Sequence, residues 1–194
     1  MKVYDLAQKL YPGPAQFPGD PPVHIEAIKT IDEDGYQLEL FSAGSHAGTH
    51  VDLPRHLFLS GKTVDEVPAE AFVGRAQVLR GAGGIGPEEL ARMPQLEVIL
   101  LASSSEIWLT EEGAAFLAGK VKGVGTQSAS IDPLDSTELP AHKCLLGAGI
   151  WIAENLNLAA APKTEFLYIG SPVALCGAGA AWARPVGIVP FPFK

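Results

Sequence analysis

Cysteine and basic residues are scarce in this 194-residue chain, and each shortage excludes a class of protein. Two cysteines, Cys144 and Cys176, are too few for the disulfide framework that supports small secreted folds. The chain has 14 Lys and Arg residues and 22 Asp and Glu residues, which gives a formal net charge of −8. Because no basic run offsets this charge locally, a nucleic acid is not an expected partner.

Long apolar runs are also missing from the chain. The longest candidates, residues 98–102 and 173–181, are shorter than the ~18 residues that a membrane-spanning helix needs, so no membrane partner is expected. Asp5 and Gln8 interrupt the N-terminal stretch before the apolar region of a signal peptide could form. We therefore expect both cysteines to be buried thiols in a reducing compartment, and the protein to be cytoplasmic.

Apolar residues make up 47% of the chain, a content that excludes a disordered protein. Twenty-one glycines and 16 prolines are spread along it, so they separate many short elements and leave no obvious linker between domains. Candidate strands are residues 2–6, 24–31, 36–43, 75–80, 97–102, 122–126, 149–154, 165–170 and 185–189. Candidate helices are residues 87–93, 110–119 and 139–147, and residues 32–35 suit a hairpin turn. The pattern predicts a β-rich α/β fold in a single domain over residues 1–194.

The glycine-rich segment at residues 81–86, GAGGIG, matches the G-x-G-x-x-G pattern of dinucleotide-binding loops. The helix candidate that follows it is only about seven residues long, and no βαβ unit surrounds it. We therefore interpret this segment as a flexible turn.

A cluster of metal-ligand residue types stands out between residues 46 and 56. Three of the five histidines and one aspartate lie there: His46, His50, Asp52 and His56. Gly48 and Pro54 argue against a helix, whereas an extended chain would place all four side chains on one face. Imidazole nitrogens and a carboxylate suit Zn²⁺ or Mn²⁺. The alternative is a half-buried strand whose polar face is simply solvated.

These eleven residues, HAGTHVDLPRH, resemble the HxGTHxDxPxH signature of the cyclase-like metal-dependent hydrolases, a family that includes bacterial kynurenine formamidase (arylformamidase) and isatin hydrolase. Further segments resemble the same family: PGD at 18–20, SIDP at 130–133, LPAH at 139–142, LLGAGI at 145–150 and ENL at 154–156. The resemblance covers most of the chain. It implies a swivelling β/β/α type of fold, in which a mixed, partly barrel-like sheet is flanked by a few short helices.

The resemblance also implies a binuclear metal site. His46, His50 and Asp52 match the ligands of the first ion, His142 matches the ligand of the second, and Asp52 and Glu154 match the bridging carboxylates. Two divalent ions per chain are therefore expected, with Zn²⁺ preferred and Mn²⁺ as the alternative. The residues alone single out neither position, because His142 on a short helix could be a surface histidine and Glu154 at a strand end a solvated charge.

The residue that matches His56 donates and accepts protons in this family, so the resemblance implies an amidohydrolase that acts on a small aromatic molecule. The leading reaction is hydrolysis of an N-formyl aryl amine, such as N-formylkynurenine to kynurenine and formate. The alternatives are hydrolysis of a cyclic amide or ester, and a non-catalytic metal- or ligand-binding protein; a proton carrier favours the enzyme. We also expect a homo-oligomer, either a dimer or a tetramer.

One residue and one C-terminal segment depart from the formamidase pattern. Phe17 stands where formamidases usually carry a substrate-lining Trp before PGD, so it is our candidate for substrate binding through its aromatic ring. Near the C-terminus, residues 177–187 read GAGAAWARPVG in place of an Asp-Gly-x-Pro-like stretch, and Trp182 and Arg184 are expected to shape a different pocket there.

Overall fold

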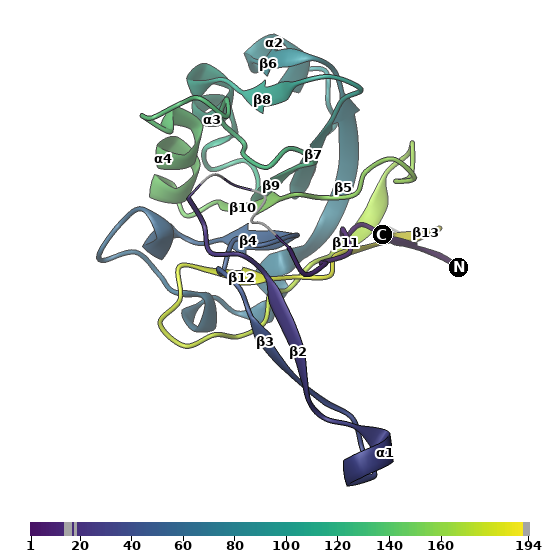
Figure 1. The fold of residues 1–194 in the computed structure, drawn as a ribbon. Coiled ribbons are helices and arrows are strands. Elements are labelled where there is room, and N and C mark those ends of the chain that lie inside the picture. The colour runs from purple at the N-terminus through teal and green to yellow at the C-terminus, as the bar shows by residue number, and fades with distance from the viewer. Residues whose placement is uncertain (14–16, 18, 192–194) are drawn as a thin grey trace.

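A mixed β-sheet runs through the molecule (Figure 1). The structure is a computed structural model and describes residues 1–13, 17 and 19–191. In spatial order its strands are β1 (Lys2–Asp5), β13 (Val186–Val189), β11 (Phe166–Ile169), β5 (Val73–Arg80), β7 (Val98–Ala102), β9 (Gly123–Thr126), β10 (Trp151–Glu154), β4 (His50–Asp52) and β12 (Ala180–Trp182). The four strands from β5 to β10 are parallel, and the flanking strands are antiparallel. The sheet is strongly curled, so the predicted mixed, partly barrel-like sheet is confirmed.

The central strands are apolar on both faces because both faces are covered. In β7, Val98 and Leu100 point into one core while Ile99 and Leu101 point into another. Such a strand reads as a continuous apolar run, which is how the sequence predicted it. All the predicted strands are present, with ends within two residues of the predicted ones.

Short helices cover one face of the sheet. They are α2 (Pro87–Leu90), α3 (Glu111–Leu117) and α4 (Pro140–Gly147), and they lie near a small parallel pair formed by β6 (Gly83–Ile85) and β8 (Ile107–Leu109). The side chain of Thr110 caps α3 by accepting a hydrogen bond from the Gly113 N–H, and a proline opens both α2 and α4. The predicted helices are confirmed, although α2 ends three residues early.

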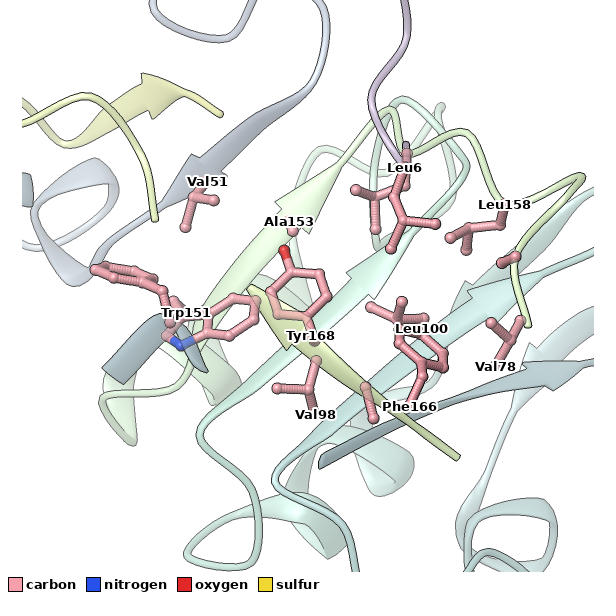
Figure 2. Close-up of a cluster of buried hydrophobic side chains, with 14 of the residues drawn as sticks. Leu6, Val51, Val78, Val98, Leu100, Trp151, Ala153, Leu158, Phe166 and Tyr168 are labelled. Atoms are coloured by element: carbon pink, nitrogen blue, oxygen red, sulfur yellow. The ribbon is translucent and has the colours of Figure 1, made fainter. Parts of the chain in front are cut away.

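The other face of the sheet curls around a second apolar core (Figure 2). Trp151 and Tyr168 stack there with ring centroids 5.6 Å apart, and the Trp151 indole N–H donates to the Ala71 carbonyl. A Cβ at Gly123 would overlap the Trp151 ring, so the neighbouring strand β9 requires glycine at this position. Three 3₁₀ helices border this region, η1 (Pro54–His56), η2 (Val64–Glu66) and η3 (Ala69–Phe72).

A two-stranded arm projects away from the rest of the molecule (Figure 1). It consists of β2 (His24–Lys29), the single-turn helix α1 (Ile31–Asp34) and β3 (Leu38–Ser42). The hairpin was predicted, but the tight turn expected at residues 32–35 is wrong. Thr30 accepts a hydrogen bond from the Glu33 N–H, and Gly35 takes a left-handed conformation with φ of 79°, so the connection winds into a helical turn.

The glycine-rich segment also differs from the prediction. Gly83–Ile85 forms strand β6 and pairs with β8, so it is not a flexible turn. A Cβ at Gly84 would lie 2.9 Å from the Thr110 side chain and 3.0 Å from the Trp108 indole nitrogen. The glycines therefore permit close packing of two strands.

The cysteines do not behave as predicted. Cys144 is half-buried and Cys176 is exposed, because Cys176 lies in a surface connection between β11 and β12. Among the described residues, no helix has both the length and the apolar character to cross a membrane. The cytoplasmic location stays a prediction.

Candidate metal centre

Two adjacent strands carry the centre of the site. β4 pairs antiparallel with β10 so that His50 lies opposite Glu154, and Asp52 follows His50 by two residues. Because strand side chains alternate between faces, these three groups project to the same side of the sheet. Val51 and Ala153 point to the opposite side and belong to the curled core. The apolar side therefore anchors the strands, and the polar side forms the site.

The prediction of one extended face from residue 46 to residue 56 is wrong, because only residues 50–52 form a strand. Gly48 turns the preceding segment with φ of 64°, and Pro54 starts the 3₁₀ helix that carries His56. These turns still bring the flanking histidines to the aspartate. His46 Nε2 lies 3.2 Å from Asp52 Oδ1 and 3.1 Å from His56 Nδ1.

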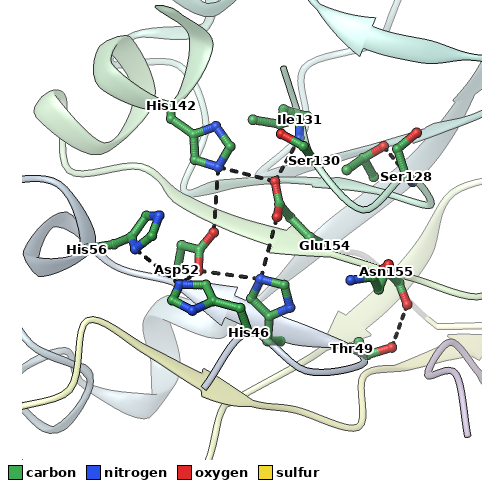
Figure 3. A network of polar contacts seen from close by, with 12 residues as sticks. His46, Thr49, Asp52, His56, Ser128, Ser130, Ile131, His142, Glu154 and Asn155 are labelled. Carbon is green, nitrogen blue, oxygen red and sulfur yellow. Dashed lines mark hydrogen bonds and ion pairs between the residues drawn. The ribbon is translucent and has the colours of Figure 1, made fainter. Parts of the chain in front are cut away.

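His142 and Glu154 join the same cluster from the other half of the chain (Figure 3). His142, on α4, is buried, and its Nε2 lies 3.2 Å from Glu154 Oε1 and 3.7 Å from Asp52 Oδ2. The N–H of Ile131 donates to Glu154 Oε1 at 2.7 Å and holds that carboxylate in place. The structure thus brings together all six residues that the resemblance selected around the cluster.

The outer nitrogen has its own partner in three of the four clustered histidines, His46, His50 and His142. The partners of Nδ1 are Gly48 O for His50 (2.9 Å), Asp132 Oδ2 for His142 (2.7 Å) and Ser45 Oγ for His46 (3.1 Å). With Nδ1 occupied, the Nε2 atom of each ring faces the carboxylates. This outer hydrogen bonding is typical of metal-ligating histidines, because it fixes the ring orientation and the tautomer.

The residues present fit a divalent cation. Within the described part of the chain, His50 Nε2 and both carboxylate oxygens of Asp52 are buried without a hydrogen-bond partner. Buried polar atoms are costly unless something compensates them, and a cation would compensate all three. Two ligand groups can be drawn, one of His46, Asp52 and His56 and one of His50, Asp52 and Glu154, and Asp52 belongs to both. The cluster is therefore a site for divalent metal, with the nitrogen and oxygen donors that Zn²⁺ and Mn²⁺ accept.

The charged groups of the cluster shift one another's pKa. Burial disfavours the charged form of each, but the carboxylates of Asp52 and Glu154 raise the pKa of His50 to about 9. For His142, the hydrogen-bonded carboxylate of Asp132 and the nearby carboxylates of Asp52 and Glu154 outweigh burial and raise the pKa to about 12. The histidines in turn hold the pKa of Asp52 well below its usual range and lower that of Glu154. At neutral pH, the metal-free cluster therefore holds two protonated histidines beside two carboxylates.

Metal binding is expected to release protons at neutral pH, because His50 and His142 must be neutral to act as ligands. Below the His50 pKa, a binding step that displaces one proton gains about tenfold in affinity per pH unit. The overall constant for occupying both positions, which displaces two protons, should therefore rise about 100-fold per unit between pH 6 and pH 8. Titration calorimetry with Zn²⁺ in two buffers of different ionisation enthalpy measures the released protons. A His24→Ala variant is the control for binding elsewhere, and an affinity independent of pH in this range would contradict the prediction.

The cluster forms one side of a cavity of about 260 Å³. Phe17, Asp20 and Ser130 also line it, and so do Leu139 and Asn155. Leu139 (φ 50°) and Asn155 (φ 55°) are the non-glycine residues with positive φ in the described part of the chain. Strained backbone of this kind concentrates at functional sites. The volume lies just below the ~300 Å³ at which ligand pockets usually begin, so the cavity suits a small molecule only.

Trp182 and Arg184 do not line this cavity, although Trp182 lies opposite His50 in the pairing of β12 with β4, so a role for them in shaping the pocket stays a prediction. The Trp182 indole N–H donates to the Gly44 carbonyl, and its ring packs against Phe41. Arg184 is exposed and forms an ion pair with Asp5. Pro18, the first residue of the PGD segment, lies outside the described residues.

Three residues of the site were not selected individually from the sequence. Asp132 orients His142 and also accepts hydrogen bonds from the N–H groups of Ala141 and His142, so one carboxylate holds both the ring and the start of α4. Thr49 donates to the Asn155 carbonyl at 2.6 Å and accepts from the Gln8 N–H, which connects the segments beside strands β4 and β10. The signal for Asp132 and Asn155 was their place in the SIDP and ENL segments.

Known proteins are similar to this chain in sequence and architecture. The putative cyclase family matches residues 4–133. The kynurenine formamidase of Salinibacter ruber is 33% identical, and the alignment covers 96% of this chain and 97% of the relative. Isatin hydrolase A from Labrenzia aggregata, bound to benzyl benzoate, superposes with a TM-score of 0.86 at 25% identity over 96% of this chain and 93% of the other. A predicted metal-dependent hydrolase from Bacillus stearothermophilus superposes with a TM-score of 0.80 at 25% identity, over 96% and 97% of the two chains. These similarities extend over both the strands that carry the cluster and the helix that completes it, and they show that this chain belongs to the putative cyclase family and is a hydrolase.

Proposed function

We propose that this hydrolase cleaves an N-formyl aryl amine, with N-formylkynurenine as the leading substrate and kynurenine and formate as the products. The observation that carries the proposal is the convergence of three imidazole Nε2 atoms and two buried carboxylates on one small cavity. The relative named kynurenine formamidase supports the choice of substrate, because its similarity covers nearly the whole of both chains.

Two divalent ions, Zn²⁺ or alternatively Mn²⁺, are proposed for the cluster. His46, His50 and Asp52 would hold the first ion and His142 the second, with Asp52 and Glu154 shared between them. When bound, such ions supply a water of lowered pKa and a Lewis acid for the formyl oxygen. The short distances from Asp52 to three histidines support its shared position.

His56 is the proposed proton carrier. Burial lowers its pKa, so its ring is neutral at pH 7 and can accept a proton. Nδ1 is the atom that faces the cluster, 3.1 Å from His46 Nε2. It would take a proton from the attacking water as the oxygen adds to the formyl carbon, and pass it to the nitrogen as the C–N bond breaks. Formate and the free amine then leave.

A second candidate is hydrolysis of a cyclic amide or ester, which the structural similarity to isatin hydrolase A favours. The non-catalytic alternative conflicts with membership of a hydrolase family. Assays of the Zn²⁺-loaded protein on N-formylkynurenine, isatin and a simple lactone separate the first two. We expect kcat/KM to be highest for N-formylkynurenine, and a preference for isatin or the lactone would overturn the formamidase assignment.

Phe17 is proposed to contact the aromatic ring of the substrate. It lines the cavity and is 40% exposed, so it can be reached by a bound molecule. Aromatic stacking contributes about 0.5–1.5 kcal/mol beyond area burial, so Phe17→Ala should lower kcat/KM for N-formylkynurenine by roughly 2- to 13-fold. The same variant should leave a small aliphatic formamide almost unaffected.

Steady-state kinetics on both substrates measures this difference. Phe191→Ala is the matched control, because Phe191 is equally exposed at 40% and lies outside the cavity lining. Equal losses on the aryl and aliphatic substrates would contradict a stacking role for Phe17.

A further inference from the structure

Asn155, the residue directly after β10, is buried beside the cavity and carries a carboxamide that the fold does not use. The residue is only 6% exposed and belongs to the cavity lining. Within the described part of the chain, neither the oxygen nor the nitrogen of this carboxamide forms a hydrogen bond. Because a buried polar group without a partner is costly, the carboxamide requires an explanation.

The backbone of Asn155 is held in an unusual conformation. Its φ of 55° lies in the left-handed region. Its N–H donates to the Ser128 carbonyl at 2.9 Å, and its carbonyl accepts from the Thr49 hydroxyl at 2.6 Å. Glycine adopts this conformation at lower cost than asparagine does. The carboxamide is therefore what asparagine adds at this position, and two neighbouring segments fix the backbone from which it projects.

Few other side chains in the cavity lining can donate a hydrogen bond. Outside the metal cluster, the described lining residues are Phe17, Asp20, Ala129, Ser130, Leu139 and Asn155. The carboxylate of Asp20 accepts hydrogen bonds but donates none, which leaves Ser130 and Asn155 as neutral donors. The Ser130 hydroxyl already accepts a hydrogen bond from the Asp132 N–H at 3.2 Å. The carboxamide of Asn155 is thus the donor of this lining that has no other partner among the described residues.

Asn155 and His56 lie at opposite ends of the cluster (Figure 3). His56 is the proposed carrier of the proton to the leaving nitrogen, so the nitrogen of a bound substrate lies toward His56. The formyl oxygen is attached to the same carbon and points away from that nitrogen, which directs it toward the Asn155 end. A carbonyl oxygen has two lone pairs, so it can accept from Asn155 while the other lone pair faces the cluster.

We infer that the carboxamide of Asn155 donates a hydrogen bond to the formyl oxygen and stabilises the negative charge that develops there, an inference that rests on the proposed function. As the water oxygen bonds to the formyl carbon, the π electron pair of the carbonyl moves onto the oxygen, and Asn155 Nδ2–H stabilises it without giving up its proton. The pair returns when the C–N bond breaks and His56 supplies its proton to the nitrogen. The amine leaves, and the formic acid loses its proton to solvent and leaves as formate. A donor that is in place before the reaction needs no reorganisation when the charge forms, so Asn155 acts mainly on the transition state.

Asn155→Gly tests this inference, because glycine keeps the left-handed backbone and removes only the carboxamide. In the Zn²⁺-loaded protein, kcat for N-formylkynurenine should fall about 100-fold, while KM changes by less than about threefold. Melting temperature and metal content should stay at wild-type values. Asn157→Gly is the matched control, because Asn157 is exposed and lies outside the cavity lining, and its kcat should equal that of the wild type.

The thioformyl analogue of the substrate gives a second readout, because sulfur accepts hydrogen bonds only weakly. On this analogue, the ratio of wild-type kcat to Asn155→Gly kcat should shrink to less than about tenfold. A role of Asn155 that is only structural would instead lower the rate by the same factor on both substrates.

Three results would overturn the inference: wild-type kcat in Asn155→Gly, a loss confined to KM, and an equal loss of kcat on the oxygen and sulfur substrates. Failure of the proposed function is a separate result. A wild-type protein that cleaves isatin but not N-formylkynurenine would overturn the formamidase assignment alone, and the kcat of Asn155→Gly on isatin would then decide the role of Asn155. A wild-type protein that cleaves neither would overturn both.

Discussion

Replacing Asp52 by asparagine is expected to empty the metal centre and to abolish hydrolysis. Asp52 is fully buried, and its oxygens lie 3.2 Å from His46 Nε2, 3.5 Å from His50 Nε2 and 3.7 Å from His142 Nε2. Each proposed ion loses a ligand, and the two cations lose the negative charge between them. Elemental analysis after dialysis should fall from about two divalent ions per chain to near zero, since even outer-sphere changes cost about 10–100-fold in metal affinity.

Asp135→Asn is the matched control for this variant, because Asp135 is exposed and lies outside the cluster. It should keep wild-type metal content and turnover. If Asp52→Asn retained both ions after dialysis, the shared position of Asp52 would be wrong. A wild-type protein without transition metal after expression in Zn²⁺- and Mn²⁺-supplemented medium would remove the basis of the proposed mechanism.

The His56→Ala variant is expected to keep its metal and lose turnover. Proton transfer by a positioned side chain is worth about 10²–10⁴-fold in rate, so kcat should fall by that factor. His56 lies on a short 3₁₀ helix with no buried residue, so the fold should tolerate the change. Steady-state kinetics and elemental analysis on the same preparation separate the two effects, and added imidazole should restore part of the lost rate.

His24→Ala is the control for loss of a histidine, since His24 lies on the arm and is exposed. It should behave as wild type in both measurements. Loss of one ion from His56→Ala would instead make His56 a metal ligand, which its position beside His46 and Asp52 also permits. Wild-type turnover in this variant would leave proton transfer without an assigned residue.

Local signals in the sequence predicted most of the elements but not all of them. The apolar run of β7 and the Thr110 cap of α3 are detectable over a few residues. β4 and β12 are only three residues long, and β4 carries two polar side chains of the site, so neither has a strand pattern. β6 was missed because its glycines suggest a turn, whereas here they allow close contact with β8.

The site could be predicted only in part from local pattern. The i, i+2 spacing of His50 and Asp52 is a strand property, and the structure keeps it. Glu154 reaches the cluster through the antiparallel pairing of β10 with β4, and His142 reaches it through the packing of α4. Both are long-range contacts that only the family resemblance could supply. The turns at Gly48 and Pro54 were visible, but their effect on His46 and His56 depends on the neighbouring chain.

The strands carry reactive groups and the loops form much of the cavity wall, and this separation affects how the substrate selectivity of such enzymes can change. Three of the groups that define the chemistry, His50, Asp52 and Glu154, are attached to two paired strands inside the sheet. The rest of the cavity wall comes largely from connecting segments, including Phe17, Asp20 and Leu139. Mutations in those segments can change the shape offered to the substrate while the reactive groups keep their spacing. Directed evolution confined to these loop positions should therefore yield new substrate selectivities from an unchanged catalytic core. In the same way, proteins that descend from one ancestor can come to accept different substrates while the reaction mechanism stays the same.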